Sequence, residues 1–314
     1  MTVLLTGSLA YDIIMTHNGK FSDNLIGGKL DDLNVAFLID SKEKEFGGCG
    51  GNIAFNLSLL GEEVDLIGRA GRDFADYEEW LTEININTDS VIIHDDLDTA
   101  IAYVTTDSDG NQITSFYPGV MQKPDKFRPS SRRQYELAVI SPEDTDWMNT
   151  AIDYCIANKI PYVFDPGQQI PALSKKQLMH GIESAQVVIV NKYEFELIQA
   201  KTGLTAKGLI KQVPTFIVTL GSKGSHIYTY GNLFKIGIAT PRKVVDPTGC
   251  GDAYRAGIVT GMRCGFGWEL TGQMAATIAS YAVEEFGTQN HYFELEEFNT
   301  RLKKNFNAEL NLEH

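Results

Sequence analysis

Short apolar runs recur along the chain, and segments with helical periodicity separate several of them. We expect six of these runs to form buried strands, at residues 3–6, 64–67, 137–140, 162–164, 187–190 and 216–219. Amphipathic segments with the spacing of a helix lie at residues 53–60, 145–157 and 194–200. Continuous apolar strands spaced by helices are typical of a parallel sheet that is covered on both faces. The pattern therefore predicts a doubly wound, mainly parallel α/β fold.

Two segments break this alternation. Residues 12–46 show little helical periodicity, whereas residues 99–117 have the pattern of a β-hairpin. In that hairpin, strands at 101–105 and 112–116 would flank a turn at Asp109-Gly110. We interpret residues 1–314 as a single domain that carries a small β-strand lid, inserted at about 12–46 and 99–120. Ordinary surface hairpins are the alternative interpretation.

Composition and charge narrow the class of partner. Apolar residues make up 43% of the chain, enough for a large core, and no apolar run reaches the ~18 residues of a membrane span. Lys and Arg total 27 against 41 Asp and Glu, which gives a formal net charge of −14. Such a field repels nucleic acid and anionic membranes, so we expect a small molecule as the partner.

The cysteines and the first residues favour a cytoplasmic protein. Cys49, Cys155, Cys250 and Cys264 have neither CxxC nor Cys/His metal spacing, so we expect reduced thiols. The first residues lack the basic region and the long apolar segment of a secretory signal. We expect a monomer or a homodimer.

The most informative motif covers residues 244–257. An apolar strand end is followed by a turn of small residues, and Asp252 then opens a helix that we expect to reach residue 262. Small residues let backbone amides approach a ligand, and the first turn of a helix attracts an anion. The amides of Gly249, Cys250 and Gly251 would therefore hold a phosphoryl group.

Phosphoryl transfer accounts for a carboxylate in the same turn. A protein serves this chemistry mainly by positioning the reactants and neutralising charge. Asp252 would accept the proton of the acceptor hydroxyl as the new bond forms; the alternative is that it only caps the helix. The turn is no dinucleotide fingerprint, because Tyr254 occupies its third glycine position, and no Walker A sequence occurs.

A second glycine-rich run, Gly47-Gly48-Cys49-Gly50-Gly51-Asn52, predicts a tight loop before a helix. Asn52 offers both a donor and an acceptor, which suits vicinal hydroxyls, but it could equally be an N-cap. Asp12 follows the first strand, at the edge where open α/β sheets bind ligands. Its alternative role is that of a solvated loop residue.

Two further segments follow buried strands. Asn191 comes directly after residues 187–190, and Glu194 stands at the distance of a capping-box partner. Thr219, Gly221 and Gly224 belong to a strand that ends in a glycine-punctuated turn. On the residues alone, a helix cap and a plain hairpin entry explain these two segments.

The two glycine-rich motifs together resemble the signatures of the ribokinase (PfkB) carbohydrate kinase family. Residues 46–54, continuing to 60–61 and 68–74, resemble its N-terminal signature, and residues 246–252 resemble its C-terminal signature. Pro247 is additional to the commonest form, and Cys250 replaces the usual Ala. The resemblance spans nearly the whole chain. It implies a ribokinase-like fold and an ATP-dependent kinase.

The resemblance also implies roles for single residues. The positions matching those that hold sugar hydroxyls are Asp12, Gly48 and Asn52, with Gly47 beside them at the lid hinge. Asn191 and Glu194 match an Asn-x-x-Glu motif that orders Mg²⁺ through water. The strand end expected to contact ATP comprises Thr219, Gly221 and Gly224. The neighbourhood of Asp246 could hold a monovalent cation such as K⁺.

Several segments further resemble the bacterial adenosine-kinase-like branch: residues 46–57, 109–114, 165–168, 246–257 and 288–291. The implied reaction is adenosine + ATP → AMP + ADP, a purine salvage step at the 5′-hydroxyl. Phe116, with Tyr117 and Met121, could supply an apolar face for the base, or could form the lid core instead. The alternatives are a sugar kinase of the ribokinase or fructokinase type, a broad nucleoside kinase and a catalytically silent ligand-binding regulator.

Overall fold

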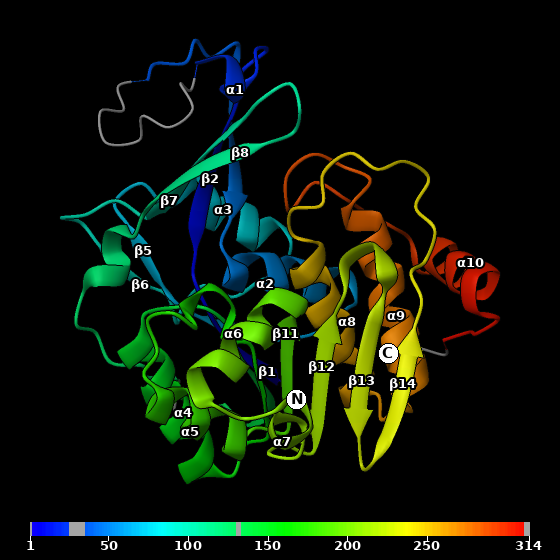
Figure 1. Cartoon of the computed structure of the whole chain (residues 1–314). Helices are drawn as coiled ribbons and strands as arrows, with labels where there is room; N and C mark the ends of the chain where they lie inside the picture. The colour runs from blue at the N-terminus through cyan, green and yellow to red at the C-terminus, as the bar shows by residue number, and fades with distance from the viewer. Residues whose placement is uncertain (1, 25–34, 130–132, 311–314) are drawn as a thin grey trace.

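The computed structural model of the chain describes residues 2–24, 35–129 and 133–310. Within them, the main sheet has eight strands in the order β14-β13-β12-β11-β10-β9-β1-β4 (Figure 1). Neighbours from β4 to β12 pair in parallel, whereas β13 and β14 add an antiparallel edge. These strands are β1 (Thr2–Thr6), β4 (Val64–Ile67), β9 (Tyr135–Ile140), β10 (Tyr162–Phe164), β11 (Val187–Asn191), β12 (Thr215–Thr219), β13 (Ser225–Thr229) and β14 (Asn232–Ile236). The expected doubly wound architecture is confirmed.

Helices cover both faces of this sheet, which explains why its central strands are apolar throughout. Val187 and Ile189 of β11 belong to one buried core, and Val188 and Val190 belong to the other, because successive side chains of a strand point to opposite faces. The first face carries α2 (Cys49–Leu59), α3 (Ala75–Glu83), α8 (Cys250–Arg263), α9 (Trp268–Ala282) and α10 (Leu295–Phe306). The second carries α4 (Thr145–Asn158), α5 (Lys175–Ser184), α6 (Lys192–Thr202) and α7 (Ala206–Ile210).

The helices expected at 53–60, 145–157 and 194–200 correspond to α2, α4 and α6. Local capping sets their first residues. The Asp144 side chain accepts the N–H groups of Asp146 and Trp147 at the start of α4, and α2 begins four residues early because its glycines are helical. Among the described helices, none is both long and apolar enough to cross a bilayer.

A second, smaller sheet has the order β3-β2-β7-β8. It consists of β2 (Ala10–Thr16), β3 (Ser41–Gly47), β7 (Ala100–Thr106) and β8 (Gln112–Tyr117). Since β1 ends at Thr6 and β2 begins at Ala10, this sheet starts at the carboxyl edge of the main sheet, and Figure 1 shows it rising above that edge. Part of the first expected insertion, residues 25–34, lies outside the described residues.

The expected hairpin is present as β7 and β8, but its turn is built differently. Gly110 has a left-handed φ of 80°, whereas the Asp107 carboxylate organises the loop. It accepts the N–H groups of Asp109 at 3.0 Å and Asn111 at 2.8 Å, and that of Phe21 in the short helix α1 (Phe21–Asn24) at 3.0 Å. The turn is therefore centred on Asp107 and tied to the neighbouring segment, not built on Asp109-Gly110 alone.

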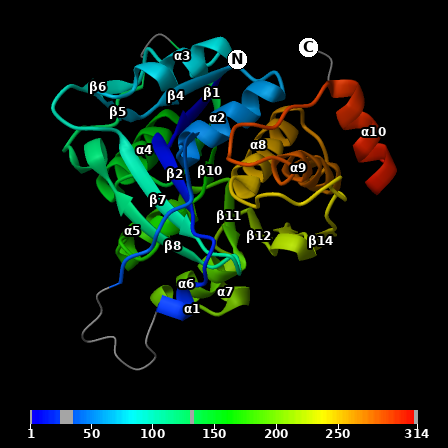
Figure 2. The ribbon, with the colours of Figure 1, turned by 90° about the horizontal axis from the view of Figure 1, so that it is seen from above.

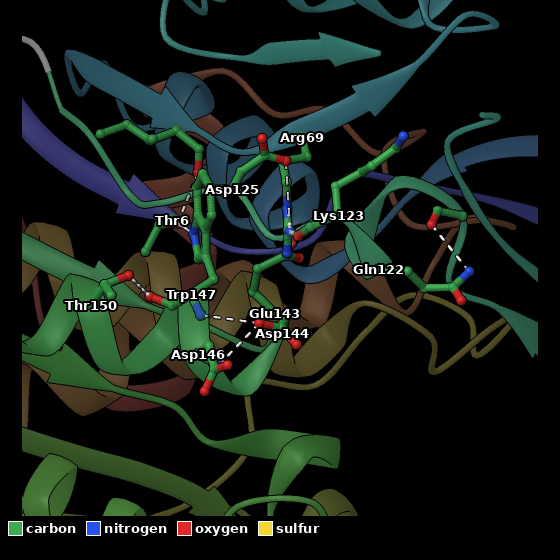
Figure 3. A network of polar contacts seen from close by, with 12 residues as sticks. Thr6, Arg69, Gln122, Lys123, Asp125, Glu143, Asp144, Asp146, Trp147 and Thr150 are labelled. Atoms are coloured by element: carbon green, nitrogen blue, oxygen red, sulfur yellow. Dashed lines mark hydrogen bonds and ion pairs between the residues drawn. The ribbon is translucent and has the colours of Figure 1, made fainter. Parts of the chain in front are cut away.

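A buried ion pair fastens the chain that leaves the small sheet to the main domain (Figure 3). Arg69 begins β5 (Arg69–Gly71), which pairs with β6 (Ile92–His94). Its guanidinium donates to Glu143 Oε1 from Nε at 3.0 Å and from Nη2 at 2.5 Å, and to the Lys123 carbonyl oxygen at 2.5 Å. It also stacks over the Trp147 ring at 4.7 Å. Lys123 follows the 3₁₀ helix η2 (Gly119–Gln122), so this network links the return from β8 to the start of α4.

Candidate active site

The glycine-rich turn before α8 forms the centre of the site. Gly249 is the N-cap with a left-handed φ of 78°, and α8 begins at Cys250, two residues before the helix start that we expected. The amides of the first turn have no partner within the helix and carry the positive end of its dipole. α2 and α8 lie side by side in both views (Figures 1 and 2). The turn therefore faces the start of the other glycine-rich segment.

Asp252 lies inside this first turn. Its Oδ2 accepts a hydrogen bond from Asn52 Nδ2 at 2.9 Å, across a separation of 200 residues. Burial raises the pKa of the Asp252 carboxyl to about 6, while the charge of Arg255 and the Asn52 hydrogen bond act in the opposite direction. A carboxylate with this pKa is suited to accept a proton near neutral pH.

Arg255 and Asp165 form a buried ion pair below Asp252, a role that the sequence did not reveal. Arg255 Nη2 donates to Asp165 Oδ1 at 2.8 Å, and its Nε contacts the other carboxylate oxygen. A methyl group on Gly251 would come within 2.7 Å of Arg255 Nη1, so the guanidinium lies directly against the turn. The available signals were an arginine one helical turn after Asp252 and an aspartate at the end of β10.

Asn52 is a buried part of α2, with 5% of its surface exposed. Gly48, with a φ of 84°, occupies the N-cap, so the N-cap interpretation of Asn52 is wrong. The side-chain oxygen of Asn52 accepts from Thr288 Oγ1 at 2.8 Å and from Gln289 Nε2 at 3.0 Å. The expected tight loop is reduced to Gly48, because the residues after it are helical. A side chain on Gly48 would overlap the Ser8 carbonyl oxygen.

Asp12 lies within β2, not in a loop after β1, so its interpretation as a solvated loop residue is wrong. A side chain on Gly47 would overlap the Asp12 carboxylate, so the carboxylate can occupy this position only because residue 47 is a glycine. Burial raises the pKa of Asp12 to about 6, with further contributions from the nearby charges of Asp252, Asp246 and Glu45. Asp12 and Asp252 thus face the same region from the two sheets' sides.

Phe116 lies on the same face of the small sheet as Asp12. Asp12 is paired in register with Ala102 of β7, and Ala102 is paired with Phe116 of β8. Phe116 is 52% exposed, and Tyr117 is exposed as well, so neither forms lid core. Met121 is the residue that does: it is buried against Ala10 and Ala100.

A cavity of about 440 Å³ lies against the glycine-rich turn before α8. The predicted nucleotide-side residues that line it are Asn191, Thr219, Gly221 and Gly224, together with Cys250 and Gly251 of the turn. An apolar wall that sequence reasoning missed comprises Ile238, Ala239, Val244, Ala276, Ala279 and Val283. Half of this wall comes from an irregular segment without periodicity, which is why no pattern indicated it.

Asn191 and Glu194 form the capping box at the start of α6. The Asn191 N–H donates to Glu194 Oε2 at 2.7 Å, and the Glu194 N–H donates to Asn191 Oδ1 at 2.8 Å. Burial raises the pKa of Glu194, and the charge of Asp165 adds to the effect. Within the described ranges, no three His, Cys, Asp or Glu side chains converge as a metal cage. The Glu194 carboxylate as a Mg²⁺ contact through water stays a prediction; an ion of this kind keeps most of its waters and binds phosphates.

Asp246 braces the turn from outside. Its Oδ1 accepts the Thr248 N–H at 2.9 Å, and its Oδ2 accepts the Gly287 N–H at 3.2 Å. The carboxylate therefore joins the glycine-rich turn before α8 to the segment that follows α9. A monovalent cation near Asp246 stays a prediction.

Comparison with known proteins agrees with this arrangement. The family model for pfkB family carbohydrate kinases matches residues 8–294. A nucleoside kinase from Methanocaldococcus jannaschii is 32% identical over 278 residues, which cover 88% of this chain and 91% of that protein. The structure of Burkholderia thailandensis nucleoside kinase in complex with inosine has a TM-score of 0.87 at 32% identity, covering 98% of this chain and 99% of the other. Its complex with ADP-inosine has a TM-score of 0.85 at 32% identity, covering 98% and 97%.

Proposed function

Because the chain belongs to the pfkB family of carbohydrate kinases, we propose that it is an ATP-dependent nucleoside kinase with Asp252 as its general base. One observation carries the proposal: Asp252 lies between two differently lined regions. Asn52 and Asp12 stand on one side of it, and the cavity of about 440 Å³ opens on the other side at Gly251. A kinase needs this division, because its acceptor and its phosphate donor must meet at one base.

The proposed reaction follows from these positions. Asp252 accepts the proton of the acceptor hydroxyl. The hydroxyl oxygen of the acceptor bonds to the γ-phosphorus of ATP as the bond from that phosphorus to the ADP oxygen breaks. The amides of Gly249, Cys250 and Gly251 stabilise the charge of the transferred group. The apolar wall of the cavity offers a surface for the adenine of ATP. Glu194 would order Mg²⁺ through water, and the ion would supply neutralisation of phosphate charge.

The acceptor that we propose is a nucleoside, with adenosine preferred. Asp12, Ala102 and Phe116 follow one another across three strands, which places the aromatic ring about 10 Å from the carboxylate at two interstrand spacings. The small Ala102 between them leaves room for a flat ring. A nucleoside suits this row, because its ribose hydroxyls reach Asp12 while its base covers Phe116. The inosine complex of the Burkholderia protein supports a purine nucleoside.

A broad nucleoside kinase is the second candidate, favoured by inosine in that neighbour and by the name of the Methanocaldococcus relative. A sugar kinase would use the same Asp252, Asn52 and Asp12, but it would leave Phe116 without a ligand. A silent regulator has no need of the base and its hydrogen-bond donor, both of which the chain retains.

An acceptor panel tests the proposal. With ATP and Mg²⁺, ADP release should give kcat/KM values in the order adenosine, inosine, ribose, with fructose no better than ribose. Free sugars forgo burial of the base, worth ~25 cal/mol per Å² of apolar area. Inosine keeps the stacking but presents an oxygen in place of an amino group, at a cost of ~1 to 3 kcal/mol for an unpaired partner.

Two variants of β8 locate the acceptor pocket. Phe116→Ala should lower kcat/KM for adenosine at least tenfold, since a few kcal/mol of apolar contact are lost, and should leave that for ribose within about twofold. Ile113→Ala is the matched control, because Ile113 is also exposed but points to the opposite face of the strand. A panel led by ribose or fructose would reject the nucleoside while retaining the kinase, and equal effects of the two variants would remove Phe116 from the pocket.

A further inference from the structure

Three consecutive hydrogen bonds connect Trp80 of α3 to the proposed base. Trp80 Nε1 donates to Gln289 Oε1 at 2.9 Å, and Gln289 Nε2 donates to Asn52 Oδ1 at 3.0 Å. Asn52 Nδ2 then donates to Asp252 Oδ2 at 2.9 Å. We propose that Trp80 is a positioning residue, which fixes the side-chain orientation of Asn52 against Asp252 through Gln289. This inference rests on the proposed role of Asp252 as the base.

The chemistry of each group gives the relay its direction. The side-chain amide of an Asn or Gln can take two orientations, in which its oxygen and nitrogen exchange places. An indole N–H only donates, so Trp80 selects the orientation of Gln289 in which the oxygen faces α3. The Gln289 nitrogen must then face Asn52, which selects the orientation that turns the Asn52 oxygen away from Asp252. The side-chain nitrogen of Asn52 therefore points to Asp252 and donates to it.

The relay is embedded in a buried network that leaves little freedom for another arrangement. Gln289 Nε2 also donates to the Tyr77 hydroxyl at 2.6 Å, and Tyr77 donates to the Gly47 carbonyl oxygen at 2.9 Å. A side chain on Gly51 would overlap that hydroxyl, so the glycine makes space for Tyr77. Both Gln289 and Asn52 are nearly inaccessible to water, so a lost partner is not replaced by solvent.

The surroundings of Asp252 make this orientation matter. The charged groups that act on its region are Asp12 from β2, Asp165 from the end of β10, Glu194 from α6 and Arg255 from α8. The thiols of Cys49 and Cys250 and the phenol of Tyr77 also face it. Three of these four charged neighbours are acidic; the charge of Asp165 raises the pKa of Asp252, whereas that of Arg255 lowers it. A reversed Asn52 would add a carbonyl oxygen against the carboxylate, in place of a donor that stabilises it.

Trp80→Phe tests the relay in the intact protein. It removes the indole N–H and keeps an aromatic ring next to Phe46 and Phe55, which Trp80 now stacks on. We expect kcat to fall by about 10- to 100-fold, the range for a displaced positioning group, and the acid limb of the kcat/KM profile to move up by about one pH unit. The acid limb moves to higher pH because the Asp252 carboxylate loses a stabilising donor, and its pKa therefore rises.

Trp147→Phe is the matched control. Trp147 Nε1 donates to Thr6 Oγ1 at 2.7 Å, so this variant also loses a tryptophan and a buried indole hydrogen bond, away from the relay. It should lower Tm while its acid limb stays at the wild-type position. An equal displacement of the acid limb in both variants, or in neither, would overturn the relay.

Gln289→Met keeps the question open to measurement if Trp80→Phe does not fold. It should by itself move the acid limb in the same direction. Where Trp80→Phe does fold, adding it to Gln289→Met should cause no further shift, because the relay is already broken. Independent, additive shifts would contradict the proposal. Asp252→Asn distinguishes a failure of the base assignment from a failure of the relay. An active Asp252→Asn enzyme would contradict the role of Asp252 as the base. An inactive one, together with an unchanged pH profile of Trp80→Phe, would contradict the relay alone.

Discussion

At the scale of single residues, the Asp252 carboxylate is stabilised by two neighbours, one close to it in the sequence and the other distant. Arg255 lies one turn further along the same helix, whereas Asn52 reaches it from the other glycine-rich segment. Both keep the carboxylate ionised against the effect of burial. The pKa of about 6 of this proposed base is therefore a balance between burial and these two partners.

Asp252→Asn should reduce kcat by ~10² to 10⁴, the usual contribution of a general base. An amide of the same shape can still accept from Asn52, so Tm and ATP affinity should stay near their wild-type values. In the unmodified enzyme, activity should fall as the pH drops below about 6, because protonation removes the carboxylate that accepts the proton. The checks are steady-state kinetics from pH 5 to 8 and ATP titration of the variant. A folded variant with wild-type turnover would remove Asp252 from the mechanism.

The sequence identified those site residues that stand inside short motifs, and it missed those whose roles depend on distant contacts. Asp252, Asn52 and the amides of the turn were found because small residues and a carboxylate occur together. Trp80 and Gln289 meet across 209 residues, and Arg255 meets Asp165 across 90. Periodicity carries no information on such pairings.

At the scale of elements, the start of α6 combines two roles that the sequence left as alternatives. The capping box of Asn191 and Glu194 is present, so the structural role is real. The burial of Glu194 and its proximity to Asp165 and Asp252 place the same carboxylate in the acidic region of the site. A helix cap and a metal contact are compatible, because the cap uses only one of the two carboxylate oxygens.

Glu194→Gln separates these two roles. The glutamine oxygen can still accept the Asn191 N–H, so we expect Tm to change by no more than about 2 °C. The loss of charge should raise the Mg²⁺ concentration for half-maximal activity by about tenfold, since a carboxylate is the preferred partner of this ion and its waters. Ser174→Ala, which removes the cap of α5, is the control: it should lower Tm and leave the Mg²⁺ requirement unchanged. An unaltered requirement in Glu194→Gln would limit Glu194 to capping.

Elements were predictable where burial dictates composition. β1, β9 and β11 are apolar on both faces, and the sequence placed each of them within one or two residues. β3 was missed because its sequence, SKEKEFG, is charged and mostly exposed, as suits an edge strand. The short strands β5 and β6 have three residues each, too few for any period.

At the scale of the whole molecule, two sheets meet at the proposed site. The main sheet supplies Asp252 through α8 and Asn52 through α2, and the small sheet supplies Asp12 and Phe116. β8 is exposed along its whole length, whereas Tyr11 of β2 is buried in the main core, so the outer strand of the small sheet is held mainly by strand pairing. Such a sheet has the low local stability that a moving element needs.

Acceptor binding should slow amide exchange in residues 101–116. Adenosine would bridge the two sheets, and closure would exclude the water that competes as a phosphoryl acceptor. Hydrogen exchange of the protein with and without adenosine measures this, and α5, on the opposite face of the main sheet, provides an internal reference that should not change. Exchange in β7 and β8 that is indifferent to the acceptor would mean that the small sheet is a fixed wall.

The pairing of Asn52 with Thr288 and Gln289 has a consequence for the nascent chain. These contacts join positions 236 and 237 residues apart. A ribosome that adds about 5 to 20 residues per second needs roughly 10 to 50 seconds between the two. Until residue 289 has been made, the Asn52 carboxamide of α2 lacks at least one of these two donors. The hydrogen bonds that orient Asn52 towards Asp252, the proposed base, are therefore complete only once the chain extends past residue 289.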